Sequence, residues 1–389
     1  MTIDIDLDPA TSVVRYAGSA DVARAGTNDS NDGWVVSRLP AWTKHQILDP
    51  ALALLVSVPS GVRLELVTDA SEIELDVALL LLRISDRPTI PAAFDLVVNG
   101  TVHTQTTTLD ATVLVIDQRT GAISFEAGSA STTVRFADLG PGPKQVEIWL
   151  PHASAVTLQA LRVNDGAGVS RPPASSRRHW VHYGSSISHC LEAAHPTETW
   201  PATTARLADL DLHSVAFAGQ CHLDQLVART IRDLPADVIS LKVGINIVNG
   251  DTMRERTFVP AVHGFLDTVR DGHPDTPIVL ISPIICPAHE DHPGPTVQGE
   301  DGAASIDRPP ELAVGSLSLR RIRTLLEAIV AARRAEGDAQ LDLIDGLTLF
   351  GPDDIGDLPD GLHPNGAGYR RIGQRFHDAV CVDGGAFAP

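Results

Sequence analysis

Val181-His182-Tyr183-Gly184-Ser185-Ser186-Ile187 runs from an apolar strand into a Gly-Ser-Ser turn, and the chain beyond it alternates between two periodicities. Apolar runs typical of buried strands lie near residues 179–184, 212–218, 237–243, 277–285 and 341–345. Stretches with a helical period lie near residues 200–208, 222–233, 257–271, 316–335 and 366–379. Strands that alternate with helices are typical of βαβ units around a parallel sheet. The sequence therefore predicts an α/β domain in which this turn ends the first strand.

Two more polar segments follow predicted strands. Gly219 comes after the apolar run 214–218, and Asn246 comes after the run 238–243. In an open parallel sheet, ligands bind beyond the carboxyl ends of the strands. We therefore expect Ser186, Gly219 and Asn246 to face one crevice.

Asp360 and His363 stand three positions apart in Leu358-Pro359-Asp360-Gly361-Leu362-His363-Pro364, far downstream of the serine turn. An imidazole accepts the proton of a serine hydroxyl, and a carboxylate holds that imidazole in the required tautomer and stabilises its charged form. A tight turn brings Asp360 and His363 together without a distant loop. The order of serine, aspartate and histidine predicts a nucleophile, its base and the partner of that base.

With these four segments the chain resembles the SGNH (GDSL) family of serine esterases and acyltransferases, in a two-domain form with an N-terminal β-sandwich. The resemblance covers residues 178–381 and implies a flavodoxin-like parallel sheet flanked by helices, with no cofactor and no metal ion. It implies Ser186 as nucleophile, His363 as base and Asp360 as its partner. As donors to a developing oxyanion it implies the N–H groups of Ser186 and Gly219 and the amide of Asn246, neutral groups that such chemistry needs.

The sequence departs from the usual family pattern at two positions. Ser185 stands where Gly-Asp-Ser has aspartate, and Ile247 follows Asn246 where aspartate is common. The first departure leaves the nucleophile open between Ser185 and Ser186, and the spacing from Gly184 favours Ser186.

Other interpretations of the polar residues remain open. Three further carboxylates near the Asp360 turn are alternative partners for His363: Asp353, Asp354 and Asp357. His289, Asp291 and His292 form a metal-like cluster, but we expect solvated loop residues because no second ligand set has recognisable spacing. Their long loop, continuing to Pro310, is a candidate lid or substrate wall. The turn at Gly184 lacks the second glycine of the G-x-S-x-G motif, which disfavours an α/β-hydrolase.

The N-terminal part of the chain shows a different pattern. Short β-rich runs include residues 53–58, 94–98, 131–136 and 146–149. Such runs with Gly, Pro, Asn and Asp turns are typical of an antiparallel sandwich or jelly roll. We expect an all-β sandwich over residues 1–165, a Gly/Pro/Ser-rich linker over 166–177, the SGNH domain over 178–381 and a tail over 382–389. The sandwich is expected to be carbohydrate-binding-like or pocket-forming; Trp34, Trp42 and Trp149 are either a sugar platform or core residues.

Composition limits the partners. The chain of 389 residues has a net charge of -19 and a pI of about 5.1, which argues against nucleic-acid binding and anionic membrane surfaces. Its acidic N-terminus does not resemble a secretory signal, and the apolar run from Val77 to Leu82 is too short to span a bilayer, so we expect a cytoplasmic protein. Four dispersed cysteines fit reduced thiols.

These observations predict a serine-dependent carboxylic ester hydrolase that forms an acyl-enzyme on Ser186 and acts on a small-molecule ester. One alternative is an acyltransferase that passes an acyl group from a thioester or ester to a hydroxyl of a polyketide or sugar. A different class of alternative is a non-catalytic glycan-binding protein. Acyl length, leaving group and oligomeric state stay open.

Overall fold

The computed structural model describes residues 2–26, 32–84, 87–117, 120, 122–299 and 302–388. The chain divides into two compact units. The first comprises Met1–Ser176 together with Ala194–Thr197, and the second comprises Arg177–Ala193 together with Glu198–Pro389. Four residues that follow Ala193 therefore belong to the N-terminal unit, although they lie far along the chain.

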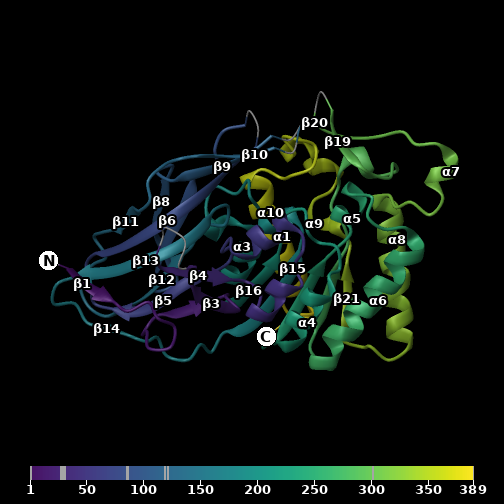
Figure 1. Ribbon diagram of the computed structural model, residues 1–389. Coiled ribbons are helices and arrows are strands. Elements are labelled where there is room, and N and C mark those ends of the chain that lie inside the picture. Colours follow the sequence, from purple (N-terminus) through teal and green to yellow (C-terminus); the bar gives the residue numbers. More distant parts are fainter. Residues whose placement is uncertain are drawn as a thin grey trace. The chain divides into compact units, whose positions relative to one another are not determined.

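The first unit contains a larger sheet with the strand order β10-β9-β6-β13-β4-β3 (Figure 1). β1 pairs with β13, β11 pairs with β6, and only the contact between β6 and β9 is parallel among the pairs described. Its strands are β1 (Thr2–Ile5), β3 (Asp21–Arg24), β4 (Trp34–Ser37), β6 (Ile73–Ile84), β9 (Thr112–Ile116), β10 (Ile123–Glu126), β11 (Thr132–Phe136) and β13 (Ala155–Asn164).

The second sheet of this unit has the order β14-β5-β12-β7-β8, with β2 on β5, and its pairs are antiparallel. Its strands are β2 (Arg15–Ala17), β5 (Arg63–Thr68), β7 (Ala92–Val98), β8 (Thr101–Thr108), β12 (Lys144–Trp149) and β14 (Val169–Ser170). Apolar residues from both sheets form one buried cluster that includes Val77, Phe94 and Ile148. Alternation along much of β6 and β13 sends one set of side chains into this core. The predicted antiparallel β-rich N-terminal part is confirmed.

The turn between β7 and β8 shows how local chemistry shapes this unit. Asn99 and Gly100 both have positive φ, 48° and 80°, which is the backbone of a type I′ hairpin turn. Asn99 Oδ1 also accepts a hydrogen bond from the N–H of Gln145 at 2.9 Å. Asparagine and glycine tolerate this region of φ better than other residues, so the dipeptide sets the register of the hairpin.

One predicted β-run of the N-terminal part is a helix. Residues 53–58 were expected in a strand, but α1 (Pro50–Val56) occupies most of them after the 3-10 helix η1 (Ala41–His45). Asp49 caps this helix by accepting hydrogen bonds from the N–H groups of Ala51 and Leu52, and Pro50 stands at its first position. The helix start formed by Asp49 and Pro50 therefore determines the structure here, although the apolar run had indicated a strand. β14 lies within the expected linker and pairs with β5.

The second unit contains a parallel sheet with the order β16-β15-β17-β18-β21. Its strands are β15 (Arg178–Gly184), β16 (Leu210–Ala216), β17 (Val238–Lys242), β18 (Ile278–Ile281) and β21 (Leu341–Ile344). In order of sequence this is 2-1-3-4-5, the flavodoxin-like arrangement, and the chain reverses direction across the sheet beside β15. The predicted α/β class is confirmed.

Helices cover both faces of this sheet (Figure 1). Trp180 of β15 stacks on Phe376 with ring centroids 5.7 Å apart, whereas Tyr183, on the opposite face of the strand, stacks on Phe265 at 5.1 Å. The longer helices are α3 (Trp200–Leu207), α4 (Gln225–Asp233), α6 (Glu255–Gly272), α8 (Leu319–Ala335) and α10 (Gly366–Val380). Shorter ones are α2 (Ser186–His189), η2 (Pro196–Glu198), α5 (Ile245–Asn249), η3 (Pro287–His289), α7 (Pro310–Ala313), α9 (Gly346–Leu349) and η4 (Pro352–Asp357).

The loop after β18 is more ordered than its composition indicated. We expected a structureless segment through Pro310, but β19 (Thr296–Gly299) and β20 (Gly302–Ser305) form an antiparallel hairpin within it. None of the helices in the described ranges combines the length and apolar composition that crossing a bilayer requires.

Candidate active site

The serine turn begins where β15 ends. Ser185 is the N-cap of α2, and its side chain accepts a hydrogen bond from the N–H of Ile187 at 3.3 Å. Ser185 is fully buried, whereas Ser186 is 8% exposed and is the first residue of the helix. The two serines therefore do different things, since one caps the helix and the other presents its hydroxyl beyond the strand.

Gly184 leaves the space that this turn needs. A Cβ atom on Gly184 would lie 2.4 Å from Ser188 Oγ and 2.6 Å from Ser188 Cβ, closer than side-chain carbons approach one another. A larger residue would push the first turn of α2 away from the sheet. The glycine is required by close approach of the helix to the strand.

Three side chains form a hydrogen-bonded series at this end of the sheet. Ser186 Oγ lies 2.9 Å from His363 Nε2, and His363 Nδ1 lies 2.8 Å from Asp360 Oδ2. An ionised carboxylate only accepts hydrogen bonds, so His363 donates from Nδ1 and its Nε2 is left to accept the proton of the serine hydroxyl. This is the arrangement in which an imidazole acts as a base toward a serine.

The Asp360 loop is built locally. Asp360 Oδ1 accepts hydrogen bonds from the N–H groups of Leu362 at 3.0 Å and His363 at 2.7 Å, and Gly361, which follows Asp360, has a φ of 75°. Burial raises the pKa of Asp360, but the hydrogen bonds and charge interaction with His363 and the two N–H donors lower the pKa more, so the net shift is well below its usual range. Asp360 therefore stays ionised beside the imidazole.

The hairpin after β18 supports this loop from the other side. The N–H of Ala303 donates to the carbonyl oxygen of Asp360 at 2.8 Å, and a Cβ on Gly302 would lie 2.4 Å from that same oxygen. Cys286 Sγ also donates to the carbonyl of Gly361 at 3.4 Å. The long segment predicted as a lid or wall thus contacts the backbone of the acid loop directly.

Three hydrogen-bond donors lie at the ends of neighbouring strands. Gly219, after β16, has a φ of 72°, and nothing lies within 4 Å of where its Cβ would be. Within the described part of the chain, the N–H groups of Ser186 and Gly219 and the Asn246 side-chain NH₂ donate to no protein acceptor. Unoccupied donors at strand ends are what an anionic ligand atom requires.

A histidine that sequence reasoning missed holds the Gly219 turn. His222 Nε2 donates to the carbonyl of Gly219 at 3.1 Å, and its Nδ1 lies 3.1 Å from Thr252 Oγ1. The spacing of three residues between Gly219 and His222 was the feature of the sequence that could have identified this histidine.

Two of the three alternative carboxylates for His363 are engaged elsewhere. Asp354 forms ion pairs with Arg371 and Arg375, and Asp357 accepts from Asn365 and pairs with Arg371. A carboxylate absent from the sequence-based set lies closer. Glu192 Oε1 is 3.7 Å from His363 Nδ1. No short motif links Glu192 to His363, so sequence reasoning had no signal for it.

The histidines of the long loop are not arranged around a cation. His289 is buried, with Nε2 2.7 Å from Thr296 Oγ1 and Nδ1 3.2 Å from the carbonyl of His292, so the expectation of a solvated residue was wrong for His289. Asp291 pairs with Arg320. Among the described residues, no group of three or more His, Cys, Asp or Glu side chains is placed to hold a metal ion.

All four cysteines are buried thiols. Burial raises the pKa of Cys221 to about 12, and burial also raises the pKa of Cys190 well above its usual value. A thiol that stays protonated near neutral pH is a poor nucleophile. The cysteines that follow Ser186 and Gly219 in the sequence therefore serve packing.

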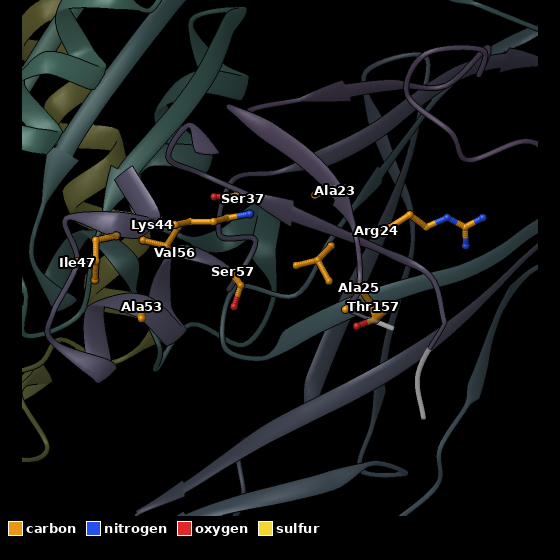
Figure 2. Close-up of a pocket in the computed structure, with 12 residues that line it drawn as sticks. Ala23, Arg24, Ala25, Ser37, Lys44, Ile47, Ala53, Val56, Ser57 and Thr157 are labelled. Carbon is orange, nitrogen blue, oxygen red and sulfur yellow. The ribbon is translucent and has the colours of Figure 1, made fainter. Parts of the chain in front are cut away.

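A hollow of about 380 Å³ lies in the first unit, against β3, β4 and α1 (Figure 2). The side chains of Lys44, Ser37 and Ser57 at this hollow have partners within the chain. Lys44 Nζ lies 3.5 Å from Asp21, and the hydroxyls of Ser37 and Ser57 donate to backbone carbonyls. Figure 2 shows the Arg24 side chain directed away from the other labelled residues. The lining residues are Ala23, Arg24, Ala25, Gly26, Val35, Ser37, Lys44, Ile47, Ala53, Val56, Ser57 and Thr157.

The tryptophans of the first unit do not line this hollow. Trp149 is buried, its Nε1 donates to Glu147, and the Arg63 guanidinium lies 5.2 Å from its ring centroid. The guanidinium of Arg24 lies 4.9 Å from the ring centroid of Trp34. Trp149 is thus a core residue, as one of the two interpretations predicted, and it cannot stack on a sugar from solution.

Comparison with known proteins gives the site its family. Residues 182–371, which contain the serine turn, both further donor turns and the Asp360 loop, match the GDSL-like Lipase/Acylhydrolase family. Residues 182–371 form a GDSL-like lipase/acylhydrolase domain. The predicted SGNH resemblance is confirmed, and the protein is an enzyme of the class that comprises serine ester hydrolases and acyltransferases. Among curated proteins, none matches the chain.

Solved structures extend the similarity beyond the acylhydrolase domain. The salicylyl-acyltransferase SsfX3 from a tetracycline biosynthetic pathway is 26% identical, with a TM-score of 0.78 over 97% of this chain and 95% of that one. An active-site mutant of a family two carbohydrate esterase from Clostridium thermocellum has a TM-score of 0.59 at 15% identity, covering 94% and 96% of the two chains. A family two carbohydrate esterase from Cellvibrio japonicus has a TM-score of 0.56 at 14% identity, covering 97% and 96%. At these identities the two carbohydrate esterases share the fold alone.

Proposed function

We propose that the enzyme transfers acyl groups through an acyl-enzyme on Ser186, with water as the acceptor, as a carboxylic ester hydrolase acting on a small-molecule ester. The observation that carries this proposal is the series of hydrogen bonds from Ser186 Oγ to His363 Nε2 at 2.9 Å and from His363 Nδ1 to Asp360 Oδ2 at 2.8 Å. It supplies a nucleophile, a base and a group that orients the base.

In the first half of the reaction, Ser186 Oγ attacks the ester carbonyl carbon while its proton passes to His363 Nε2. The carbonyl oxygen becomes an oxyanion, and the C–O bond to the alcohol breaks when the tetrahedral intermediate collapses. His363 returns the proton to the leaving alkoxide, and Asp360 stabilises the imidazolium in between. In the second half, water loses a proton to His363, attacks the acyl carbon and releases the acid and the Ser186 hydroxyl.

The oxyanion needs neutral donors that are already in place. We propose the N–H groups of Ser186 and Gly219 and the Nδ2 of Asn246 for this role, because each is unoccupied within the described chain. The open space beside Gly219 lets a substrate oxygen approach its backbone. Preorganised donors of this kind stabilise negative charge without reorganising during the reaction.

A second candidate function is acyl transfer to an alcohol. It is favoured by the similarity to a salicylyl-acyltransferase, at 26% identity over 97% of the chain. The same acyl-enzyme serves either reaction, because an alcohol held in line replaces water in the second half. An acyl donor such as a thioester or ester and a small-molecule hydroxyl would then be the two substrates.

Reaction with p-nitrophenyl acetate tests the proposal. We expect a nitrophenolate burst and an intact-mass increase by one acetyl group in the wild type. Both should be absent in Ser186→Ala, whereas Ser185→Ala, the matched control at the N-cap, should still form the adduct. An adduct that water clears quickly identifies an esterase; one that persists until an alcohol is added identifies a transferase. A full burst in Ser186→Ala would refute the assignment, and a folded wild type without burst or adduct on a panel of esters would favour a non-catalytic glycan-binding protein.

We also propose that residues 178–381 carry out the reaction, that residues 1–165 form a sandwich that shapes substrate binding, and that residues 166–177 join them, with 382–389 as a tail. The hollow beside α1 supports the pocket-forming alternative over a sugar platform, since no tryptophan lines it. Ala53→Trp should fill the hollow. If the hollow holds part of the substrate, the variant's KM for a large ester should rise above the wild-type value while its KM for p-nitrophenyl acetate stays constant. A KM for the large ester that equals the wild-type value would refute this role.

A further inference from the structure

Glu192 is a second carboxylate at the imidazole of the proposed base. Its Oε1 lies 3.7 Å from His363 Nδ1, the same nitrogen that lies 2.8 Å from Asp360 Oδ2. The side chains of Glu192 and His363 are 32% and 20% exposed. Glu192 therefore sits at the rim of the site, close enough to affect the charge of the imidazole without contacting Ser186 in any hydrogen bond of the described chain.

The position of Glu192 is set by a buried tyrosine. Tyr369 donates its hydroxyl proton to Glu192 Oε2 at 2.7 Å, and the Tyr369 ring is completely buried. Tyr369 lies in the first turn of α10, where the N-cap Asn365 accepts from the N–H of Gly368 at 2.9 Å. A helix that begins three residues after His363 thus orients the carboxylate toward the same imidazole.

The charges around this carboxylate are few. Burial, followed by the charge of Glu192, raises the pKa of Tyr369 well above its ordinary value, so the phenol stays a neutral donor. Burial likewise raises the pKa of Cys190 and brings the pKa of Cys286 to about 12, so both thiols near the site stay neutral. Among the described residues, neither Arg nor Lys forms an ion pair with Glu192. Its negative charge is therefore left to act on His363.

We infer that Glu192 is a positioning residue for His363, acting with Asp360 to stabilise the imidazolium, and that the Tyr369 hydroxyl holds it there. This inference rests on the proposed role of His363 as the base. When His363 takes the proton of Ser186, its positive charge has two carboxylates beside Nδ1 instead of one. The attraction is largest in the transition state, where the imidazolium forms, so it should change kcat more than KM.

The sign of the pH effect follows from the charge. A carboxylate near His363 favours the protonated imidazole and raises the pH below which the base is lost. Glu192→Gln removes the charge but keeps an oxygen that accepts from Tyr369. The acidic limb of kcat/KM should therefore move to lower pH by roughly half a unit, and the plateau of kcat should fall about three- to fivefold, the size expected for one partly exposed charge.

The variants are compared on p-nitrophenyl acetate between pH 4.5 and 9, and the plateau of kcat is taken from the pH range in which the wild-type profile is flat. Circular dichroism and thermal unfolding check that each variant is folded. Glu198→Gln is the matched control, because Glu198 is a nearby glutamate whose partner is Arg370 at 3.1 Å. It should leave both the acidic limb and kcat unchanged. Glu192→Asp should restore part of the shift, since it keeps the charge at a greater distance, and Tyr369→Phe should give an intermediate shift by releasing Glu192.

The Asp360 background gives an independent readout. Asp360→Ala leaves Glu192 as the remaining carboxylate beside Nδ1, so Glu192→Gln should cost more activity in that background than in the wild type. The inference is overturned if Glu192→Gln moves neither the acidic limb nor kcat, if it raises only KM, or if its effects in the two backgrounds are independent. Full activity of Ser186→Ala or His363→Ala would instead refute the proposed function, so the two failures are distinguishable.

Discussion

Asn246 Oδ1 accepts a hydrogen bond from the backbone N–H of Cys221 at 3.0 Å. This bond connects the turn after β16, which contains Gly219, with α5, which follows β17. Because the oxygen of the amide is occupied, its NH₂ group is left for a ligand. This one hydrogen bond therefore fixes the position of the Asn246 NH₂ group relative to the turn that contains the Gly219 N–H.

Asn246→Ala should lower kcat by about 100- to 1,000-fold with a smaller change in KM, the usual loss for one donor to an oxyanion. Asn246→Asp should lose at least as much, because a carboxylate keeps the bond from Cys221 but offers no donor and repels negative charge. Steady-state kinetics on p-nitrophenyl acetate measures both. A change confined to KM in both variants would mean that Asn246 binds the substrate in its ground state.

Gly184 should not tolerate a methyl group. Gly184→Ala places Cβ 2.4 Å from Ser188 Oγ, so we expect a loss of about 1–3 kcal/mol in the free energy of unfolding together with reduced kcat as the Ser186 turn shifts. Gly264→Ala is the matched control, since Gly264 lies within α6 and has nothing within 4 Å of its Cβ position. That change should stabilise the protein by up to about 1 kcal/mol. Urea unfolding measures both, and equal stabilities would contradict the close approach at Gly184.

Lys242 should make stability depend on pH in the alkaline range. Burial lowers the pKa of Lys242 from 10.5 to about 8, and its Nζ has no hydrogen-bond partner among the described residues. Between pH 8 and 10.5 the unfolded chain holds this proton and the folded chain does not, so the free energy of unfolding should rise with pH across this window.

Lys242→Met removes the unpaired charge and should stabilise the protein at pH 7 by about 3 kcal/mol, the equivalent of the shift in pKa. The advantage over the wild type should shrink toward pH 10.5. Urea unfolding at pH 7, 9 and 10.5 checks the sign, with Lys44→Met as a control because Lys44 is 56% exposed. A gain that is equal at all three pH values would exclude a charge effect.

Asp95 should hold residues 194–197 in the first unit. Asp95 is fully buried in β7, and its Oδ2 accepts from the N–H of Thr197 at 3.0 Å and from Thr197 Oγ1 at 2.6 Å, while His195 Nδ1 lies 2.9 Å from Oδ1. Asp95→Ala leaves the two Thr197 donors without their acceptor and should cost about 2–3 kcal/mol of unfolding free energy. Hydrogen exchange should increase first at residues 194–197. Asp4→Ala, at an exposed aspartate of β1 in the same unit, should change neither quantity.

Sequence alone predicted those features that depend on short-range chemistry. The Asp360-x-x-His363 turn closes through hydrogen bonds from the N–H groups of Leu362 and His363 to Asp360 Oδ1, and the strands of the acylhydrolase domain follow from short apolar runs. The same reasoning failed at α1, where an apolar run suggested a strand but the Asp49 cap and Pro50 start a helix. It also missed the hairpin at residues 296–305, whose strands bury little apolar surface and so have a weak pattern.

What only the tertiary structure decided is which residues meet across the chain. Ser186 and His363 are 177 positions apart, as are Glu192 and Tyr369, and the order of the parallel strands brings each pair together. Ser186 and His363 can be identified from residue type and spacing, because each stands in a recognisable motif. Glu192 stands in none, since its role depends on a helix and a loop packed beside it, and packing over such separations leaves no local periodicity in the sequence.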